Sequence, residues 1–149
     1  MSTTDLSPTV GAAEAARATG TERAVFSSPG RAPSTDAVVR WLRVCELGDL
    51  EVERGRAALL DDAQVALFLL VDGTVRAVAN LDPFSGAQVI SRGIVGSRGA
   101  ATTIASPMYK QIFDLRTGHC LDAQGKDPVH LRVWPVRIEG EDVMLGLEA

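Results

Sequence analysis

Short hydrophobic runs separated by polar turns make up the chain from residue 38 onward. Residues 38–45 are rich in β-branched and aromatic side chains, and successive side chains would point to alternate faces of a strand. This pattern is typical of a half-buried strand. Asp72-Gly73 lies between two such runs and is a strong hairpin signal. The predicted strands span residues 38–45, 56–60, 64–71, 74–78, 100–105, 113–115, 129–138 and 143–147. Short strands without a long helical pattern predict an all-β fold, a small antiparallel sandwich or barrel.

Two features interrupt this rhythm of strands. Residues 80–86 are predicted to leave the sheet as a loop, because Pro83 favours extended geometry before it and Gly86 permits a tight reversal. Residues 87–99 hold three glycines, but their spacing does not match a dinucleotide-binding loop and no helical pattern follows them, so a nucleotide-binding loop is disfavoured. Pro135 interrupts the run 129–138 and predicts an edge strand or a bulge, because proline cannot donate to a sheet ladder.

The chain divides into a tail and one folded domain. Residues 1–36 are rich in Ala, Thr, Ser, Gly and Pro and poor in bulky hydrophobic residues, so burial cannot offset the entropy of ordering them. We therefore predict a disordered N-terminal tail over residues 1–36 and a domain over residues 37–149. A tail that becomes ordered on a partner is the alternative.

Composition and charge exclude several classes of protein. The net charge of −4 disfavours nucleic-acid binding, which needs a concentrated basic face. No hydrophobic run approaches the roughly 20 residues that a membrane helix requires. The N-terminus lacks the basic and hydrophobic regions of a secretory signal. Cys45 and Cys120 are expected to be free thiols, as in a reducing compartment, so we expect a cytoplasmic protein.

The chain shows no catalytic motif, and we predict no catalytic residue on it. Asp82 and Asp114 lie beside turns, where aspartate commonly accepts hydrogen bonds from local backbone amides. His119 and Cys120 are adjacent in an extended segment, so their side chains should point to opposite faces. A metal site that combines them with Cys45 and His130 is therefore disfavoured, and the cysteines are expected to fill hydrophobic space.

Residues 106–118 resemble the second cluster-binding loop of Rieske-type iron–sulfur domains, a Cys-Pro-x-His segment followed by Phe-Asp-Leu-x-x-Gly. Ser106 stands at the cysteine position and Tyr109 at the histidine position. The Cys-x-His of the first loop aligns on Asn80-Leu81-Asp82, so Asn80 and Asp82 replace the other two ligands. The resemblance covers Val38 to Leu147. It implies a Rieske-like β-sandwich or barrel with two protruding loops and no cluster or other metal on this chain.

Within the Rieske-like superfamily, the length, the tail and the substituted ligands resemble the small-subunit family of assimilatory NAD(P)H nitrite reductases. This resemblance implies a cytoplasmic accessory subunit of the enzyme that reduces nitrite to ammonium. The implied partner is a large subunit carrying FAD, siroheme and a [4Fe-4S] cluster. Two alternatives remain, a Rieske-type ferredoxin that carries electrons and a free-standing interaction module on the same fold.

The two loops also carry bulky side chains that suggest a partner interface. Phe84 lies on the first loop, and Pro107, Met108, Tyr109 and Lys110 lie on the second. Loops lie at protein surfaces, and aromatic and methionine residues are enriched at the cores of interfaces. The alternative is that these side chains fold inward and fill the space that a cluster would occupy.

Overall fold

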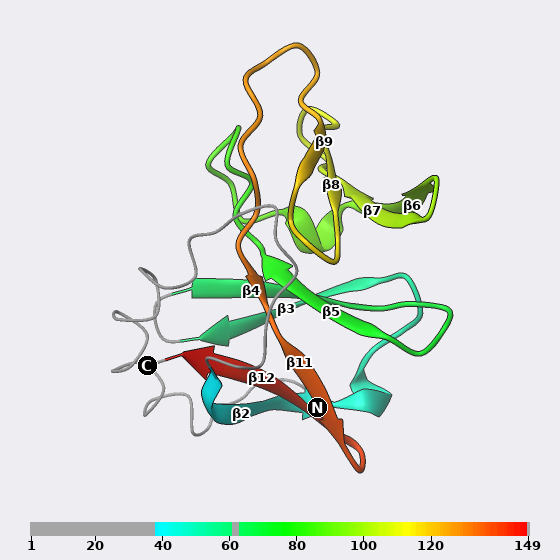
Figure 1. The fold of residues 1–149 in the computed structure, drawn as a ribbon, viewed down its shortest axis with the longest axis vertical. Coiled ribbons are helices and arrows are strands. Elements are labelled where there is room, and N and C mark those ends of the chain that lie inside the picture. Colours follow the sequence, from blue (N-terminus) through cyan, green and yellow to red (C-terminus); the bar gives the residue numbers. More distant parts are fainter. Residues whose placement is uncertain (1–37, 61–62, 149) are drawn as a thin grey trace.

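The computed structural model describes residues 38–60 and 63–148 and has three antiparallel sheets in this part of the chain (Figure 1). The tail predicted for residues 1–36 lies outside the described residues. The central sheet has the order β10 (Val133–Trp134), β5 (Val75–Ala79), β4 (Ala63–Leu69) and β3 (Gly55–Leu60). The second has the order β11 (Val136–Glu139), β12 (Asp142–Glu148) and β2 (Val38–Glu46). The third has the order β6 (Ile94–Arg98), β7 (Ala101–Ala105), β8 (Ile112–Asp114) and β9 (Cys120–Asp122).

Strand β4 lies in the central sheet and is buried on both of its faces. Val65 and Leu67 belong to one hydrophobic core, while Ala66 and Phe68 belong to a second. This division follows from the period of two along a strand. All four side chains are fully buried. Burial on both faces explains the uninterrupted hydrophobic run in the sequence, and the predicted all-β fold is confirmed.

The two cores place one sheet on each side of the central one. Val143, Leu145 and Leu147 of β12 pack in the first core, between the central and second sheets. Ile104 of β7 and Phe113 of β8 pack in the second core, which joins the central sheet to the third. In Figure 1 the second sheet lies at the lower end of the molecule and the third at the upper end.

The run predicted over residues 129–138 forms two strands in different sheets. Strand β10 pairs with β5, and β11 pairs with β12, with Pro135 between them. Both strands are edge strands, as the proline predicted, since it has no amide hydrogen to donate. The Pro135 carbonyl still accepts a hydrogen bond from Gly146 N at 2.9 Å. Pro135 is therefore the point where the chain crosses from one sheet to the other.

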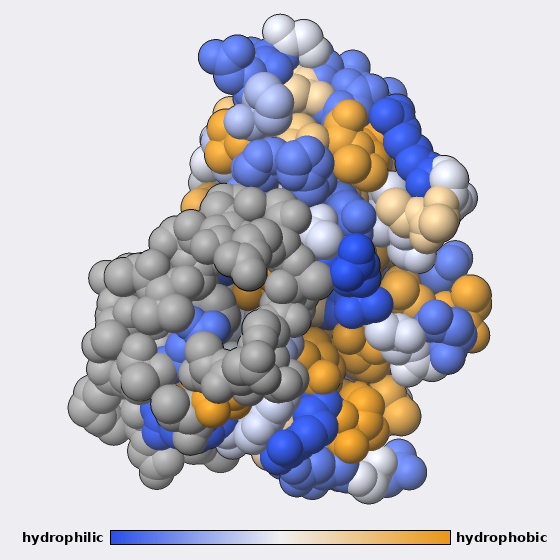
Figure 2. Space-filling view, viewed as in Figure 1, coloured by the Kyte–Doolittle hydropathy of each residue, from blue (hydrophilic) through white to orange (hydrophobic). Residues whose placement is uncertain are grey.

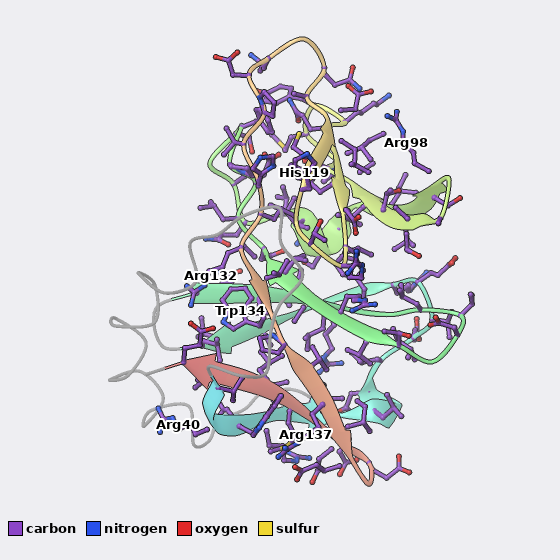
Figure 3. All side chains as sticks on the ribbon, in the orientation of Figure 1. Arg40, Arg98, His119, Arg132, Trp134 and Arg137 are labelled. Atoms are coloured by element: carbon purple, nitrogen blue, oxygen red, sulfur yellow. The ribbon has the colours of Figure 1, made fainter. Side chains whose placement is uncertain are left out.

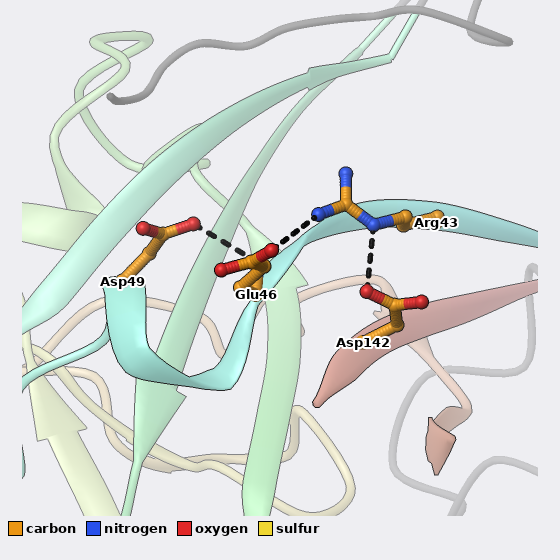
Figure 4. A network of polar contacts seen from close by, with 4 residues as sticks. All are labelled: Arg43, Glu46, Asp49 and Asp142. Atoms are coloured by element: carbon orange, nitrogen blue, oxygen red, sulfur yellow. Dashed lines mark hydrogen bonds and ion pairs between the residues drawn. The ribbon is translucent and has the colours of Figure 1, made fainter. Parts of the chain in front are cut away.

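The end of β2 is joined to β12 by a small polar network (Figure 4). Arg43 Nε donates to Asp142 Oδ1 at 2.8 Å, and its guanidinium also lies 3.5 Å from Glu46 Oε2. Asp49, in the 3₁₀ turn η2 (Leu47–Asp49), accepts from Glu46 N at 2.9 Å. These groups are largely exposed, so each ion pair contributes little to stability beyond fixing the turn.

The third sheet contains a strand that the sequence did not predict. No strand was assigned to residues 87–99 from the sequence, and they contain the 3₁₀ turn η3 (Ile90–Arg92) and then β6. Strand β6 pairs with β7 along its whole length, and most of its side chains are exposed. An edge strand with a glycine in its middle and no buried stripe lacks the hydrophobic alternation that identifies a strand.

Position 118 must be a glycine because the backbone at Leu131 packs directly against it. Gly118 has a φ of +79°, and a Cβ placed there would lie 2.1 Å from the Leu131 carbonyl oxygen. Its own carbonyl accepts a hydrogen bond from Leu131 N at 2.8 Å. Gly118 thus lets the chain before β10 lie directly against the turn between β8 and β9. No helix in the described ranges is long and hydrophobic enough to cross a membrane.

Candidate functional site

A direct hydrogen bond joins the two loops that protrude at the upper end of the molecule (Figure 1). Ser106 Oγ donates to Asp82 Oδ2 at 2.6 Å, across 24 residues of sequence. Both side chains are almost completely shielded from solvent. The sequence predicted that residues 80–82 and 106–109 belong to one site, and the structure brings Asp82 and Ser106 into contact.

Asp82 also organises the first loop from within. Its other carboxyl oxygen, Oδ1, accepts a hydrogen bond from Phe84 N at 2.8 Å. Its backbone carbonyl accepts from Gly86 N, also at 2.8 Å. This confirms the expectation that Asp82 binds local backbone amides. The contact with Ser106 could not be read from spacing, because it joins residues from different sheet connections.

Asn80 is held by three hydrogen bonds at the base of the first loop. Its Nδ2 donates to Gln64 Oε1 at 3.0 Å and to the Gln88 carbonyl at 3.2 Å. Its Oδ1 accepts from Ser91 N at 2.7 Å. Both N–H donors and the carbonyl oxygen of this buried amide are therefore bonded to protein groups, and Asn80 fixes the base of the loop.

Ser106 closes the second loop in the same manner. Its N donates to the Gln111 carbonyl at 2.9 Å, its carbonyl accepts from Lys110 N at 3.1 Å, and its Oγ accepts from Met108 N at 3.2 Å. Lys110 has a φ of +66°, a left-handed conformation that is unfavourable for a residue with a side chain. The closed turn presents Pro107 through Lys110 to solvent.

The bulky loop residues divide between solvent and core. Met108 is 45% exposed and Tyr109 is 53% exposed, so neither fills the space between the loops. Phe84 is half-buried and packs against Phe113, with ring centroids 6.1 Å apart. The residue of the second loop that turns inward is Gln111, which is fully buried. Neither polar atom of its side chain has a hydrogen-bond partner in the described part of the chain.

The residues at the four ligand positions do not fit a Rieske cluster. Such a cluster needs two thiolates on one iron and two imidazoles on the other. Asn80, Asp82, Ser106 and Tyr109 offer amide, carboxyl, hydroxyl and phenol oxygens, which are hard donors poorly suited to iron–sulfide. In addition, Ser106 and Asp82 bond directly to each other at 2.6 Å, so neither side chain is free for a metal.

The cysteines and histidines are arranged away from those positions. Cys45 lies in the first core and Cys120 in the second, and they do not form a disulfide with each other. His119 is exposed while Cys120 is buried, as adjacent residues of an extended segment should be. In residues 38–60 and 63–148, no three His, Cys, Asp or Glu side chains are gathered where they could hold a metal ion.

His119, labelled in Figure 3, stacks on His130, a contact that no sequence pattern predicted. The rings of His119 and His130 lie 4.3 Å apart at an angle of 18°. His130 Nδ1 accepts a hydrogen bond from Cys120 N at 2.8 Å, so the neutral ring carries its proton on Nε2. Burial, and then repulsion from His119, lowers the pKa of His130. The pair ties the connection before β10 to β9.

Comparison with known proteins gives the same fold and a specific set of relatives. The family model of the Rieske-like [2Fe-2S] domain matches residues 40–146. The chain is 38% identical over 84 residues to the nitrite reductase (NADH) small subunit of Escherichia coli, covering 56% of this chain and 78% of that one. A crystal structure from Mycobacterium tuberculosis, described as a candidate NADH-dependent nitrite reductase small subunit, superposes with a TM-score of 0.66. Its sequence is 47% identical, over 74% of this chain and 96% of that one.

A further relative is much longer. The chain is 40% identical over 106 residues to the nitrite reductase [NAD(P)H] large subunit of Klebsiella oxytoca, and the match spans 71% of this chain but only 11% of that protein. The fold, the two loops and the family match define the class: the chain belongs to the family of Rieske-like [2Fe-2S] domains. Within this family it belongs to the nitrite reductase [NAD(P)H] small subunits.

We predict that Ser106→Ala lowers the free energy of unfolding by about 1–3 kcal/mol, because it leaves a buried carboxyl oxygen without its partner. Urea denaturation of the variant measures this cost. Ser85→Ala is the control, since Ser85 Oγ bonds only the Ala87 amide within its own loop. A double-mutant cycle with Asp82→Asn isolates the contact, and a coupling energy near zero would contradict its structural role.

We also predict that stability falls as the pH drops below the ordinary histidine pKa of 6.5, in part because of His130. The folded chain has the lower His130 pKa, so the unfolded chain takes up the proton first. The stabilisation is complete above that pH and is lost below it. Urea denaturation between about pH 7.5 and about pH 5.5 measures the slope. His130→Asn keeps an acceptor for Cys120 N and should reduce the dependence of stability on pH. An unchanged dependence would exclude His130 as its cause.

Proposed function

We propose that this chain is the accessory small subunit of a cytoplasmic NAD(P)H-dependent nitrite reductase. The large subunit performs the reduction of nitrite to ammonium in nitrate assimilation, using FAD, siroheme and a [4Fe-4S] cluster. This chain binds no cluster and contributes structure and docking. The observation that carries the proposal is a cluster-domain fold, matched to nitrite reductase small subunits, in which three of the four predicted ligand positions, Asn80, Asp82 and Ser106, are occupied by protein hydrogen bonds.

The chemistry of the loops supports the absence of a cluster. Asn80 uses its amide on Gln64, Gln88 and Ser91, so freeing it for a metal would break the base of the first loop. The buried side chains of Asp82 and Ser106 are hydrogen-bonded to each other. Removing either partner would leave an unpaired polar group in the interior, which lowers stability. These bonds perform the cross-linking that a cluster would otherwise provide. The absence of a disulfide between Cys45 and Cys120 is consistent with a reducing compartment.

The relationship to the Klebsiella oxytoca protein supports a physical association. There, a segment 40% identical to this chain is part of the large-subunit polypeptide. In Escherichia coli, the related domain is a separate small subunit. A domain that is covalently joined in one enzyme and separate in another must bind its partner by surface contacts to serve the same role.

We assign the docking surface on this side to the loop tips, Phe84 and Pro107 through Lys110. Met108 and Tyr109 are about half exposed on a turn that hydrogen bonds hold rigid. A rigid display of aromatic and methionine side chains loses little conformational entropy when a partner covers it. The left-handed conformation of Lys110 supports this assignment, since such strain concentrates at functional loops.

We predict that the purified chain contains no stoichiometric iron or acid-labile sulfide, because its loop donors are oxygens. The Ser106→Cys, Tyr109→His double variant should remain without a cluster, because Asn80 and Asp82 are unchanged. Iron and acid-labile sulfide analysis and the visible spectrum are measured for the wild-type chain and for the double variant. A Rieske ferredoxin prepared in parallel is the positive control. Near-stoichiometric iron with a thiolate-to-iron band would instead establish the ferredoxin alternative.

We predict that the chain co-purifies with its co-expressed siroheme-containing large subunit, and that Tyr109→Ser weakens the complex roughly tenfold by removing a central aromatic contact. Biolayer interferometry measures the dissociation constant. Leu59→Ser is the control, because Leu59 is an equally hydrophobic residue that is 67% exposed on β3. Failure of the wild-type chain to associate would favour a free-standing interaction module.

A further inference from the structure

A groove of about 200 Å³ lies where the three sheets meet. Its walls come from β5 and the turn before it, from the turn after β8, and from β10 and β11. Strands β5 and β10 belong to the central sheet, while β8 and β11 belong to the third and second sheets. The groove is therefore built from segments that both hydrophobic cores hold in place. It does not include the loop tips at Asp82 and Ser106.

Two arginines line this groove without a carboxylate partner. Arg76 extends from β5 and is half-buried, and Arg116 lies on the turn after β8 and is exposed. In the part of the chain that the structure describes, neither guanidinium has a carboxylate within ion-pair distance. Arg43, Arg54, Arg98 and Arg137 each do have one. The groove therefore carries two positive charges in a chain whose net charge is −4.

The electrostatics around Arg76 show that its charge is incompletely compensated. Burial, and then the charge of Arg116, lowers the pKa of Arg76. Asp72 and Asp114 oppose this with smaller effects. Each of these carboxyl groups is used by a turn, since Asp72 Oδ1 accepts from Thr74 N and Asp114 Oδ1 accepts from Arg116 N. An anion placed between the arginines would relieve their repulsion.

The walls beside the arginines are hydrophobic. Val75, Trp134, Val136 and Ile138 line the groove, and Ile138 is 38% exposed. Figure 2 shows hydrophobic side chains gathered over the region between β5 and β11, with strongly hydrophilic ones next to them. Arginine beside exposed hydrophobic surface is the composition of an interface anchor, whereas a small free anion would gain nothing from the hydrophobic wall.

We propose that this groove receives an aspartate or glutamate side chain from a loop of the large subunit, with Arg76 and Arg116 binding its carboxylate. The apolar residues that flank this acid on the partner pack against Val136 and Ile138. Arginine is suited to this role because its planar fork can bind a carboxylate through two parallel hydrogen bonds. This inference rests on the proposed function and adds a second contact, separate from the loop tips.

The test measures binding of the full chain to its large subunit by biolayer interferometry at two salt concentrations. Arg116→Gln should weaken the complex roughly tenfold and reduce the salt dependence, because one charge-assisted contact is lost. Arg116→Lys keeps the charge and should bind more tightly than Arg116→Gln. Arg98→Gln is the matched control: it removes an exposed arginine from β6, and Figure 3 shows Arg98 well away from Trp134 on the groove wall. Circular dichroism confirms that each variant is folded.

Each outcome separates the two proposals. A complex weakened by Arg116→Gln and by the Arg76→Gln, Arg116→Gln double variant, but not by Arg98→Gln, supports the groove. A complex weakened by Tyr109→Ser but unchanged by both groove variants overturns the groove and leaves the proposed function standing. No complex with the wild-type chain overturns the proposed function and the groove with it. Equal weakening by Arg98→Gln and Arg116→Gln indicates only a general charge effect and also overturns the groove.

Discussion

Burial of β4 on both faces is the constraint on which the rest of the structure depends. Successive side chains of β4 enter two different hydrophobic cores. This one strand therefore packs against the second sheet on one face and against the third sheet on the other. A polar substitution on either face would therefore leave an unpaired group in a dry interior. Because β4 is central, the loops at one end and the groove at the sheet junction are held on a rigid base rather than on each other.

The two loops keep the arrangement of a cluster domain, but a different interaction joins them. In Rieske domains, metal–ligand bonds join the two loops. Here a buried serine–aspartate hydrogen bond joins them, and Asn80 fastens the first loop to the backbone at Gln88 and Ser91. A hydrogen bond is far weaker than a set of metal–ligand bonds, but it needs no cofactor. The tips can then keep their shape for recognition by a partner.

Two surfaces of different chemistry follow from this arrangement. The tip presents Met108 and Tyr109, which contribute mainly apolar area, while the groove presents two arginines beside a hydrophobic wall. Apolar contact contributes affinity without much discrimination, whereas a paired carboxylate fixes orientation and excludes partners that lack it. In the proposed complex, the groove would fix the orientation of this chain on the large subunit.

The sequence by itself determined the all-β class and most of the strands, because these depend on local alternation and turn residues. It also predicted the edge strands around Pro135 and the opposite faces of His119 and Cys120, which follow from backbone geometry. It missed β6, whose exposed side chains leave no pattern. Only the tertiary structure decided that Ser106 meets Asp82, that His119 stacks on His130, and that Arg76 faces the same groove as Arg116. Each of these pairs joins segments brought together by sheet packing, which no local pattern encodes.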